Sequence, residues 1–286
     1  MKIFTPRIQL LITLILLANF SFSQTSWRGT SSTKWSTSAN WTNGVPSATK
    51  DAILGDANFS GSNQPTVDKT SSCKSISIGG TVATTLTASK NLTVSGDLLI
   101  NANGVISQGN SSLSLTGSWT NNNTYSYSNN NARVIFAGVA QSINGSSVTA
   151  FRKLTVNTGS TLTMNVDFTT NNVFTVNGTI NPNTPTTYTV SPNSMTLNSG
   201  GKLLVYASTF TGNYSTNPTV NSGSTVEYAS TLINQTVSSS LTYATLIISG
   251  TTVKSLAANL PALRSTASSQ GNIFVKGGTF DLLTYT

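Results

Sequence analysis

Few residues in this chain are of types that catalyse reactions or bind metals. Its 286 residues include no histidine, a single cysteine (Cys73) and seven acidic residues. Without histidine the chain lacks the usual general base at neutral pH, the Ser-His-Asp triad and the commonest transition-metal ligand. A lone cysteine can form no intrachain disulfide and no cysteine-based metal site. We therefore interpret Cys73 as a buried structural residue rather than a link to another chain.

Paired carboxylates are the remaining route to catalysis, and glycosidases use such pairs. Most of the acids are far apart in the sequence: Asp51, Asp56, Asp68, Asp97, Asp167, Glu227 and Asp281. Asp167 and Glu227 are expected about three repeats apart, or about 14 Å along the axis of a stacked array, which is too far for a catalytic pair. Asp51 and Asp56 lack the loop pattern of a calcium site, and we expect a solvated loop there. The sequence thus predicts no enzyme, no metal site and no cofactor.

The tryptophans gather near the start of the chain, where Trp27, Trp35 and Trp41 are three of the four present. Two interpretations stay open. The rings form an exposed platform that stacks on sugar rings, or they form a cap over the first turn of a repeat array, whose core and strand edge need cover. We favour the cap.

A three-residue strand-like motif, called an apolar word below, recurs every 20 or 21 residues. The strands that it predicts must position these side chains. Its copies begin at Leu92, Leu113, Val134, Leu154 and Phe174. Each word has two branched or aromatic residues around a polar one, which is typical of a half-buried strand. A second and third apolar word fall within each period, and a period of this length is typical of stacked coils. The sequence predicts an all-β fold, a right-handed parallel β-helix (solenoid) with three short strands per coil, and no helix.

A tandem pair of antiparallel β-sandwiches is the alternative fold, since short strands at regular intervals fit it too. The words are only two or three apolar residues long, and Asn-Gly hairpin signals are few. Charged residues make up 8% of the chain, against about 25% in average proteins. Ser, Thr, Asn and Gly take their place on the surface.

The chain divides into four segments. Residues 1–23 form a predicted signal peptide, with Lys2 and Arg7 before an apolar run and cleavage after Ser23. Residues 24–74 form the tryptophan-rich cap, 75–260 the array, and 261–286 a further partial coil that we expect to continue past Thr286. Loss of the signal peptide lowers the net charge from +8 to +6. The remaining basic residues are scattered, so we predict no nucleic-acid partner, and the mature chain has no apolar run long enough to span a membrane.

An internal similarity suggests growth by duplication. Residues 133–168 resemble residues 225–260 at an offset of 92, which aligns Val134 with Val226 and Leu154 with Leu246. We expect this offset to equal four coils, with a protruding loop near residues 209–221.

Several stretches resemble secreted parallel β-helix surface and adhesin-like proteins of the Bacteroidetes and the autotransporter-passenger type. They are Ser26-Trp27-Arg28-Gly29, Asn40-Trp41, Leu92-Thr93-Val94-Ser95-Gly96-Asp97-Leu98, Gly117-Ser118-Trp119 and Arg133-Val134-Ile135-Phe136-Ala137-Gly138. The resemblance implies a bacterial stalk or adhesin-like module, secreted or at the cell surface, and carries no catalytic residue with it. Surface glycans or other cell-surface proteins are the expected partners. A carbohydrate-binding or polysaccharide-degrading β-helix is the alternative function.

Overall fold

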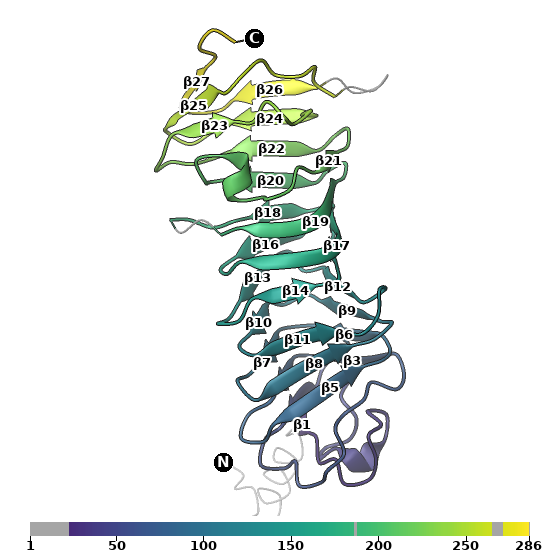
Figure 1. Ribbon diagram of the computed structural model, residues 1–286. Coiled ribbons are helices and arrows are strands. Elements are labelled where there is room, and N and C mark those ends of the chain that lie inside the picture. The colour runs from purple at the N-terminus through teal and green to yellow at the C-terminus, as the bar shows by residue number, and fades with distance from the viewer. Residues whose placement is uncertain (1–22, 186–187, 265–270, 286) are drawn as a thin grey trace, which may run out of the picture.

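The protein is a column of stacked turns, seen from N-terminus to C-terminus along one axis in Figure 1. This computed structural model describes residues 23–185, 188–264 and 271–285. The predicted signal peptide, apart from Ser23, lies outside the described residues. All strand pairs of the described sheets are parallel, which confirms the β-solenoid and shows that the antiparallel sandwich alternative is wrong.

Each turn contributes one strand to each of up to three sheets that run along the column. The 12-stranded sheet has the order β1 (Gln24–Ser26), β2 (Asp51–Leu54), β4 (Ile76–Ile78), β7 (Leu98–Ile100), β10 (Trp119–Asn121), β13 (Ala140–Asn144), β16 (Thr161–Met164), β18 (Thr179–Asn181), β20 (Lys202–Val205), β22 (Thr225–Tyr228), β24 (Thr245–Ile248) and β26 (Asn272–Val275). The 9-stranded sheet has the order β3 (Ser71–Cys73), β6 (Leu92–Val94), β9 (Ser112–Leu115), β12 (Arg133–Phe136), β15 (Lys153–Val156), β17 (Phe168–Val176), β19 (Val190–Leu197) and β21 (Thr219–Val220), and β14 (Thr149–Phe151) also pairs with β17.

Two smaller sheets complete the wall of the column. One is three-stranded, with β5 (Thr84–Ala88), β8 (Gly104–Gln108) and β11 (Thr124–Tyr127), and the other contains β23 (Gln235–Val237), β25 (Val253–Leu256) and β27 (Thr279–Asp281). Among the described residues the helical segments are two 3-10 turns, η1 (Ser38–Asn40) and η2 (Phe210–Gly212). The lack of α-helix is confirmed for this part of the chain. The predicted three strands per coil hold for only some turns, since among the described residues the smaller sheets take strands only from the turns of β5, β8, β11, β23, β25 and β27.

The interior is filled because alternate residues of each strand point inward. In β6 the pattern is buried, exposed, buried at Leu92, Thr93 and Val94, and most other strands repeat it. Aromatic rings continue the core from turn to turn, with Trp119 5.3 Å from Phe151 and Phe151 5.8 Å from Phe168 between ring centroids. Such edge-to-face contacts stabilise the stack beyond simple burial.

The tryptophan-rich segment belongs to the same stack. Its strands β1 and β2 begin the 12-stranded sheet, and β3 begins the 9-stranded sheet. At the other end, β26 pairs with β24 and β27 with β25, so residues 271–281 add another turn. The loop expected near residues 209–221 contains η2 and is anchored by Phe210 and Tyr214, which are buried.

The two segments matched at an offset of 92 occupy different sheets. Val134 lies in β12 of the 9-stranded sheet, whereas Val226 lies in β22 of the 12-stranded sheet. The offset is therefore not the whole number of turns that the sequence suggested. One local feature is shared: Gln141 and Gln235 are both buried, and each Nε2 donates to two carbonyls of the preceding turn. The duplication itself stays a prediction.

Two glycines are required for different reasons, and this difference can be tested. Gly200 has φ +79 and open space around its missing Cβ, while a Cβ on Gly117 would lie 2.2 Å from the carbonyl carbon of Gly96. Gly200→Ala should lower the free energy of unfolding by about 1 kcal/mol from backbone strain alone. Gly117→Ala should lower it by about 2–3 kcal/mol, because two adjacent turns must move apart. Urea unfolding measures both changes.

Gly200→Asn is the matched control, since asparagine tolerates positive φ better than alanine does. It should lose less stability than Gly200→Ala. Equal losses for the two substitutions at residue 200 would contradict the backbone explanation.

Candidate functional site

The three N-terminal tryptophans lie inside the first turns. Trp27 and Trp35 are fully buried and Trp41 is 2% exposed. The ring of Trp41 stands edge-on to both others, with centroids 5.0 Å from Trp27 and 4.7 Å from Trp35. None of the three rings offers a free face on which a sugar could stack.

The hydrogen bonds of the indoles differ. Trp27 Nε1 donates to the carbonyl of Asn63 at 2.8 Å, and Trp41 Nε1 donates to the carbonyl of Trp35 at 2.7 Å. Trp35 Nε1 is buried and has no hydrogen-bond partner in the described part of the chain. A buried donor without a partner is destabilising, so the cluster is held by packing and by the two bonded indoles.

Buried polar groups fix the loops around this cluster. Asn40 Oδ1 accepts from the backbone amides of Ser31 and Ser32 at 3.0 Å, and its Nδ2 donates to the carbonyl of Lys34. Asp68 accepts from the amide and the hydroxyl of Ser36. Burial raises the pKa of Asp68, but the Ser36 hydrogen bonds lower it more, so this pKa lies below its usual value. These contacts have the geometry of a structural cap.

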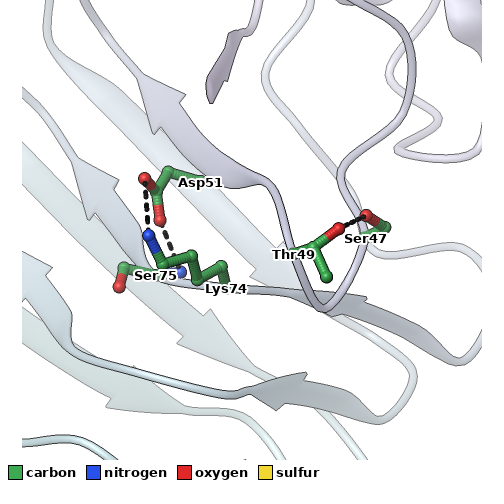
Figure 2. Close-up of polar contacts among 5 residues, drawn as sticks. All are labelled: Ser47, Thr49, Asp51, Lys74 and Ser75. Atoms are coloured by element: carbon green, nitrogen blue, oxygen red, sulfur yellow. Dashed lines mark hydrogen bonds and ion pairs between the residues drawn. The ribbon is translucent and has the colours of Figure 1, made fainter. Parts of the chain in front are cut away.

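A shallow groove on the outer face of the 12-stranded sheet brings charged residues together (Figure 2). Its volume is about 280 Å³ and its lining includes Asp51, Lys74, Ser75 and Asp97. Asp51 Oδ1 accepts from the amide of Ser75 at 3.1 Å, and its Oδ2 lies 3.8 Å from Lys74 Nζ. Figure 2 shows both contacts.

The groove follows one row of the sheet. The members of this row, each one residue before a paired strand position, are Asp51, Ser75, Asp97 and Ser118. Asp97 Oδ1 accepts from the amide of Ser118 at 2.7 Å, so each aspartate bonds to the turn that follows it. Two strand spacings of about 4.8 Å separate the aspartates along the axis. That is close to the upper limit of about 9.5 Å for the carboxyl groups of inverting glycosidases.

This pairing of Asp51 with Asp97 was not predicted from the sequence. A signal was present, because both residues stand immediately before a buried apolar word, in Asp51-Ala52-Ile53-Leu54 and Asp97-Leu98-Leu99-Ile100. The signal identifies a shared row only when the strand register is known, because the turns between the two aspartates differ in length. Asp56 is at the other end of β2, where it accepts from Ser26 Oγ at 2.6 Å.

The remaining acids are separated as expected. Asp167 precedes β17, and Glu227 lies in β22, three strands beyond β16 in the 12-stranded sheet. Glu227 forms an ion pair with Lys202 and accepts from Ser249 Oγ at 2.6 Å. Burial raises the pKa of Glu227, but these hydrogen bonds together with the charges of Lys202 and Lys276 lower it more, so this pKa falls below its ordinary value.

Sulfur and carboxylate ligands do not converge anywhere in the described ranges. Cys73 is buried, and burial raises the pKa of its thiol far above the usual value, with a smaller contribution from Asp51. Within the same ranges, no three cysteine or acidic residues cluster closely enough to hold a metal ion.

Substitutions by phenylalanine should rank the indoles by their hydrogen bonds. Trp41→Ala should lower the free energy of unfolding by about 3–5 kcal/mol, because it empties the centre of the cluster. Trp41→Phe keeps most of the volume but leaves the Trp35 carbonyl unpaired. It should therefore cost more than Trp35→Phe, which removes a donor that has no partner. Thermal unfolding followed by circular dichroism gives the order.

Two results would contradict the cap. One is a Trp41→Ala protein that keeps its melting temperature but loses binding to glycans. The other is a Trp35→Phe protein less stable than Trp41→Phe.

The ion pair of Glu227 should make the free energy of unfolding depend on pH. A carboxylate whose pKa is lowered by folding stabilises the folded state above its unfolded value, here 4.5, and this contribution is lost as the pH falls through the folded pKa. Glu227→Gln should therefore cost about 1 kcal/mol at pH 7 and progressively less below pH 4.5. Urea unfolding at a series of pH values measures the difference.

Lys202→Met supplies the control through a double-mutant cycle. In the Lys202→Met background, Glu227→Gln should have a smaller effect at pH 7. An unchanged effect would show that Lys202 does not carry the interaction.

Comparison with known proteins gives no match: no family model, curated protein or solved structure is similar to this chain. In residues 23–185, 188–264 and 271–285 there is also no helix with the length and apolar character to cross a membrane. Inference about function therefore rests on the geometry of the turns and of the side chains that they present.

Proposed function

We propose that this protein is a non-enzymatic structural or adhesin-like β-solenoid module, secreted or displayed at a bacterial cell surface. The observation that carries the proposal is that the carboxylates of Asp51 and Asp97 form hydrogen bonds within the protein. In each, Oδ1 accepts an amide hydrogen bond from the next turn, so these carboxylates act as links between turns.

The outward rows support the same function. The middle outward residues of successive strands in the 9-stranded sheet are short, neutral and polar in most turns, such as Thr93, Ser114, Thr155 and Thr175. A long, rigid surface of this kind suits repeated weak contacts with surface glycans or with other cell-surface proteins. The predicted signal peptide and the resemblance to Bacteroidetes surface proteins favour the same location.

A polysaccharide-degrading β-helix is the second candidate, and the shared groove of Asp51 and Asp97 is the observation that favours it. A general acid must present a proton to the leaving group in a substrate pose. Asp51 uses both oxygens within the protein, for Ser75 and for Lys74. Within the described residues, Asp97 Oδ2 makes no hydrogen bond or ion pair, unlike both oxygens of Asp51, which makes Asp97 the residue to substitute.

Turnover measurements separate the two functions. The purified chain is incubated with a panel of neutral and acidic polysaccharides, and new reducing ends and unsaturated products are measured. We expect no release above that of an Asp51→Asn, Asp97→Asn double variant. We also expect Asp97→Asn to lower the free energy of unfolding by about 1 kcal/mol, since it weakens a charge-assisted bond to Ser118.

Product formation that the double variant abolishes would overturn the non-enzymatic function. Glu227→Gln is the matched control, because it removes a carboxylate of the same sheet far from the groove. It should change neither the release of reducing ends nor the release of unsaturated products.

A further inference from the structure

Folding gathers basic residues that are scattered in the sequence. Five of them stand at the turn that leads into the 9-stranded sheet, and we call them the basic strip: Lys69, Lys90, Arg133, Arg152 and Lys153. Lys69 and Lys90 come two residues before β3 and β6, and Arg133 and Lys153 open β12 and β15. β3, β6, β9 and β12 follow one another up one side of Figure 1.

The register places these charges along the axis. Arg133 pairs directly with Lys153, and Arg133 also pairs with Ser112 of the turn before. Ser71 pairs with Leu92, and the same register continued along the sheet places Lys69, Lys90 and Arg152 in one row, next to the row of Arg133 and Lys153. The strip spans four strand spacings, or about 19 Å. Like charges on neighbouring strands repel each other, so folding alone does not explain this arrangement.

One carboxylate interacts with the strip, because the charge of Lys69 contributes to the lowered pKa of Asp68. Asp68 is the acid next to Lys69 in sequence, and it accepts two hydrogen bonds from Ser36. Asp51 and Glu227 lie in strands of the 12-stranded sheet, and Asp56 and Asp97 lie next to its strands. Asp167 comes directly before β17 of the 9-stranded sheet, and Asp281 is in β27. In the described residues, neither salt bridge involves a member of the strip.

One guanidinium of the strip is held in place by its neighbours. Arg152 Nη1 donates to the carbonyl of Asn171 at 2.7 Å, and the carbon of the guanidinium lies 6.0 Å from the centre of the Tyr127 ring. Asn171 Nδ2 donates in turn to the Tyr127 hydroxyl at 2.7 Å. A cation fixed in this way loses little freedom when it binds an anion. Arg133 is exposed, and its guanidinium has no hydrogen bond in the part of the chain described.

We propose that the basic strip binds an acidic polysaccharide, a chain of sugars with carboxylate groups, lying along the axis of the column. The proposal rests on the non-enzymatic surface function and names its ligand class. Strand spacing sets one turn per about 4.8 Å, which is close to the rise of one sugar in an extended 1,4-linked chain. Arginine and lysine side chains recurring at one or two turns can therefore meet carboxylates of successive sugars.

A nucleic acid fits the strip less well. Single-stranded nucleic acids bind grooves in which aromatic rings stack on successive bases. The strip has one neighbouring ring, Tyr127, and the Arg152 guanidinium lies against it. The charges also lie on one outer corner and not in a channel.

Binding of a polygalacturonate oligomer to the full purified chain tests the proposal. Titration calorimetry is carried out at low and at physiological salt, with the fully methyl-esterified oligomer as an uncharged ligand of the same backbone. The strip variant is Lys90→Gln, Arg133→Gln, Lys153→Gln. Its matched control, Arg28→Gln, Lys34→Gln, Arg264→Gln, removes three exposed charges elsewhere. Thermal unfolding confirms that both variants are folded.

We expect the acidic oligomer to bind and the esterified oligomer not to bind, with affinity falling as salt rises. The strip variant should bind about tenfold more weakly, and the control variant within about twofold of the parent chain. An Arg152→Lys variant should also weaken binding, since lysine cannot form the paired contacts of a guanidinium.

Three results would overturn the proposal: no binding of the acidic oligomer, equal losses in the strip and control variants, or tighter binding of single-stranded DNA of equal charge at the same salt. Products are measured in the same samples. Cleavage of the oligomer would refute the non-enzymatic function whether or not the strip binds, whereas absence of both binding and cleavage would refute the strip alone.

Discussion

Backbone hydrogen bonds along the axis hold each turn to the next, and the rest of the structure depends on them. The amide of Asn177 donates to Val156, the amide of Asn198 donates to Val176, and the amide of Asn221 donates to Leu197, at 2.8–2.9 Å. A parallel ladder of this kind fixes the register, so a side chain lies directly over its counterpart in the previous turn. The interior must then be apolar at the same positions in every turn. Side chains at the corners of the turns must also be able to stack directly on side chains of the same type in the neighbouring turns.

Asparagine meets that second requirement, because its amide both donates and accepts. Asn198 Nδ2 donates to Asn177 Oδ1 at 2.7 Å and Asn221 Nδ2 donates to Asn198 Oδ1 at 2.8 Å, which forms a ladder at one corner. Asn144, Asn165 and Asn183 form a second ladder elsewhere. A charged residue in such a row would face its own charge about 4.8 Å away. The low content of charged residues in this chain follows from the stacking. Several of the acids that remain accept from a backbone amide of the next turn, as Asp51 does from Ser75 and Asp97 from Ser118.

The sequence was sufficient to predict the solenoid, because the inward positions repeat at nearly constant spacing. Leu92, Leu113, Val134 and Leu154 are stacked neighbours in β6, β9, β12 and β15, as their period indicates. The row of Asp51 and Asp97 and the basic strip were not predicted. Their members are separated by turns of different length, so counting residues does not reveal which row each one occupies. For the same reason, the sequence did not reveal that Val134 and Val226, 92 residues apart, lie in different sheets.

Inward and outward residues of the turns have different roles, and this difference determines how such a column can acquire a function. An inward residue such as Phe151 contacts several rings, so its replacement disturbs more than one turn. An outward residue such as Arg133 contacts its row neighbours at a fixed spacing and can change without altering the core. Recognition on this scaffold is therefore most readily built as a row and not as a pocket, since the ladder already supplies the spacing. The two rows of this column differ in this respect: the aspartates of the 12-stranded sheet bond to the next turn, and Asp51 pairs with Lys74, whereas no salt bridge of the described residues involves the basic strip.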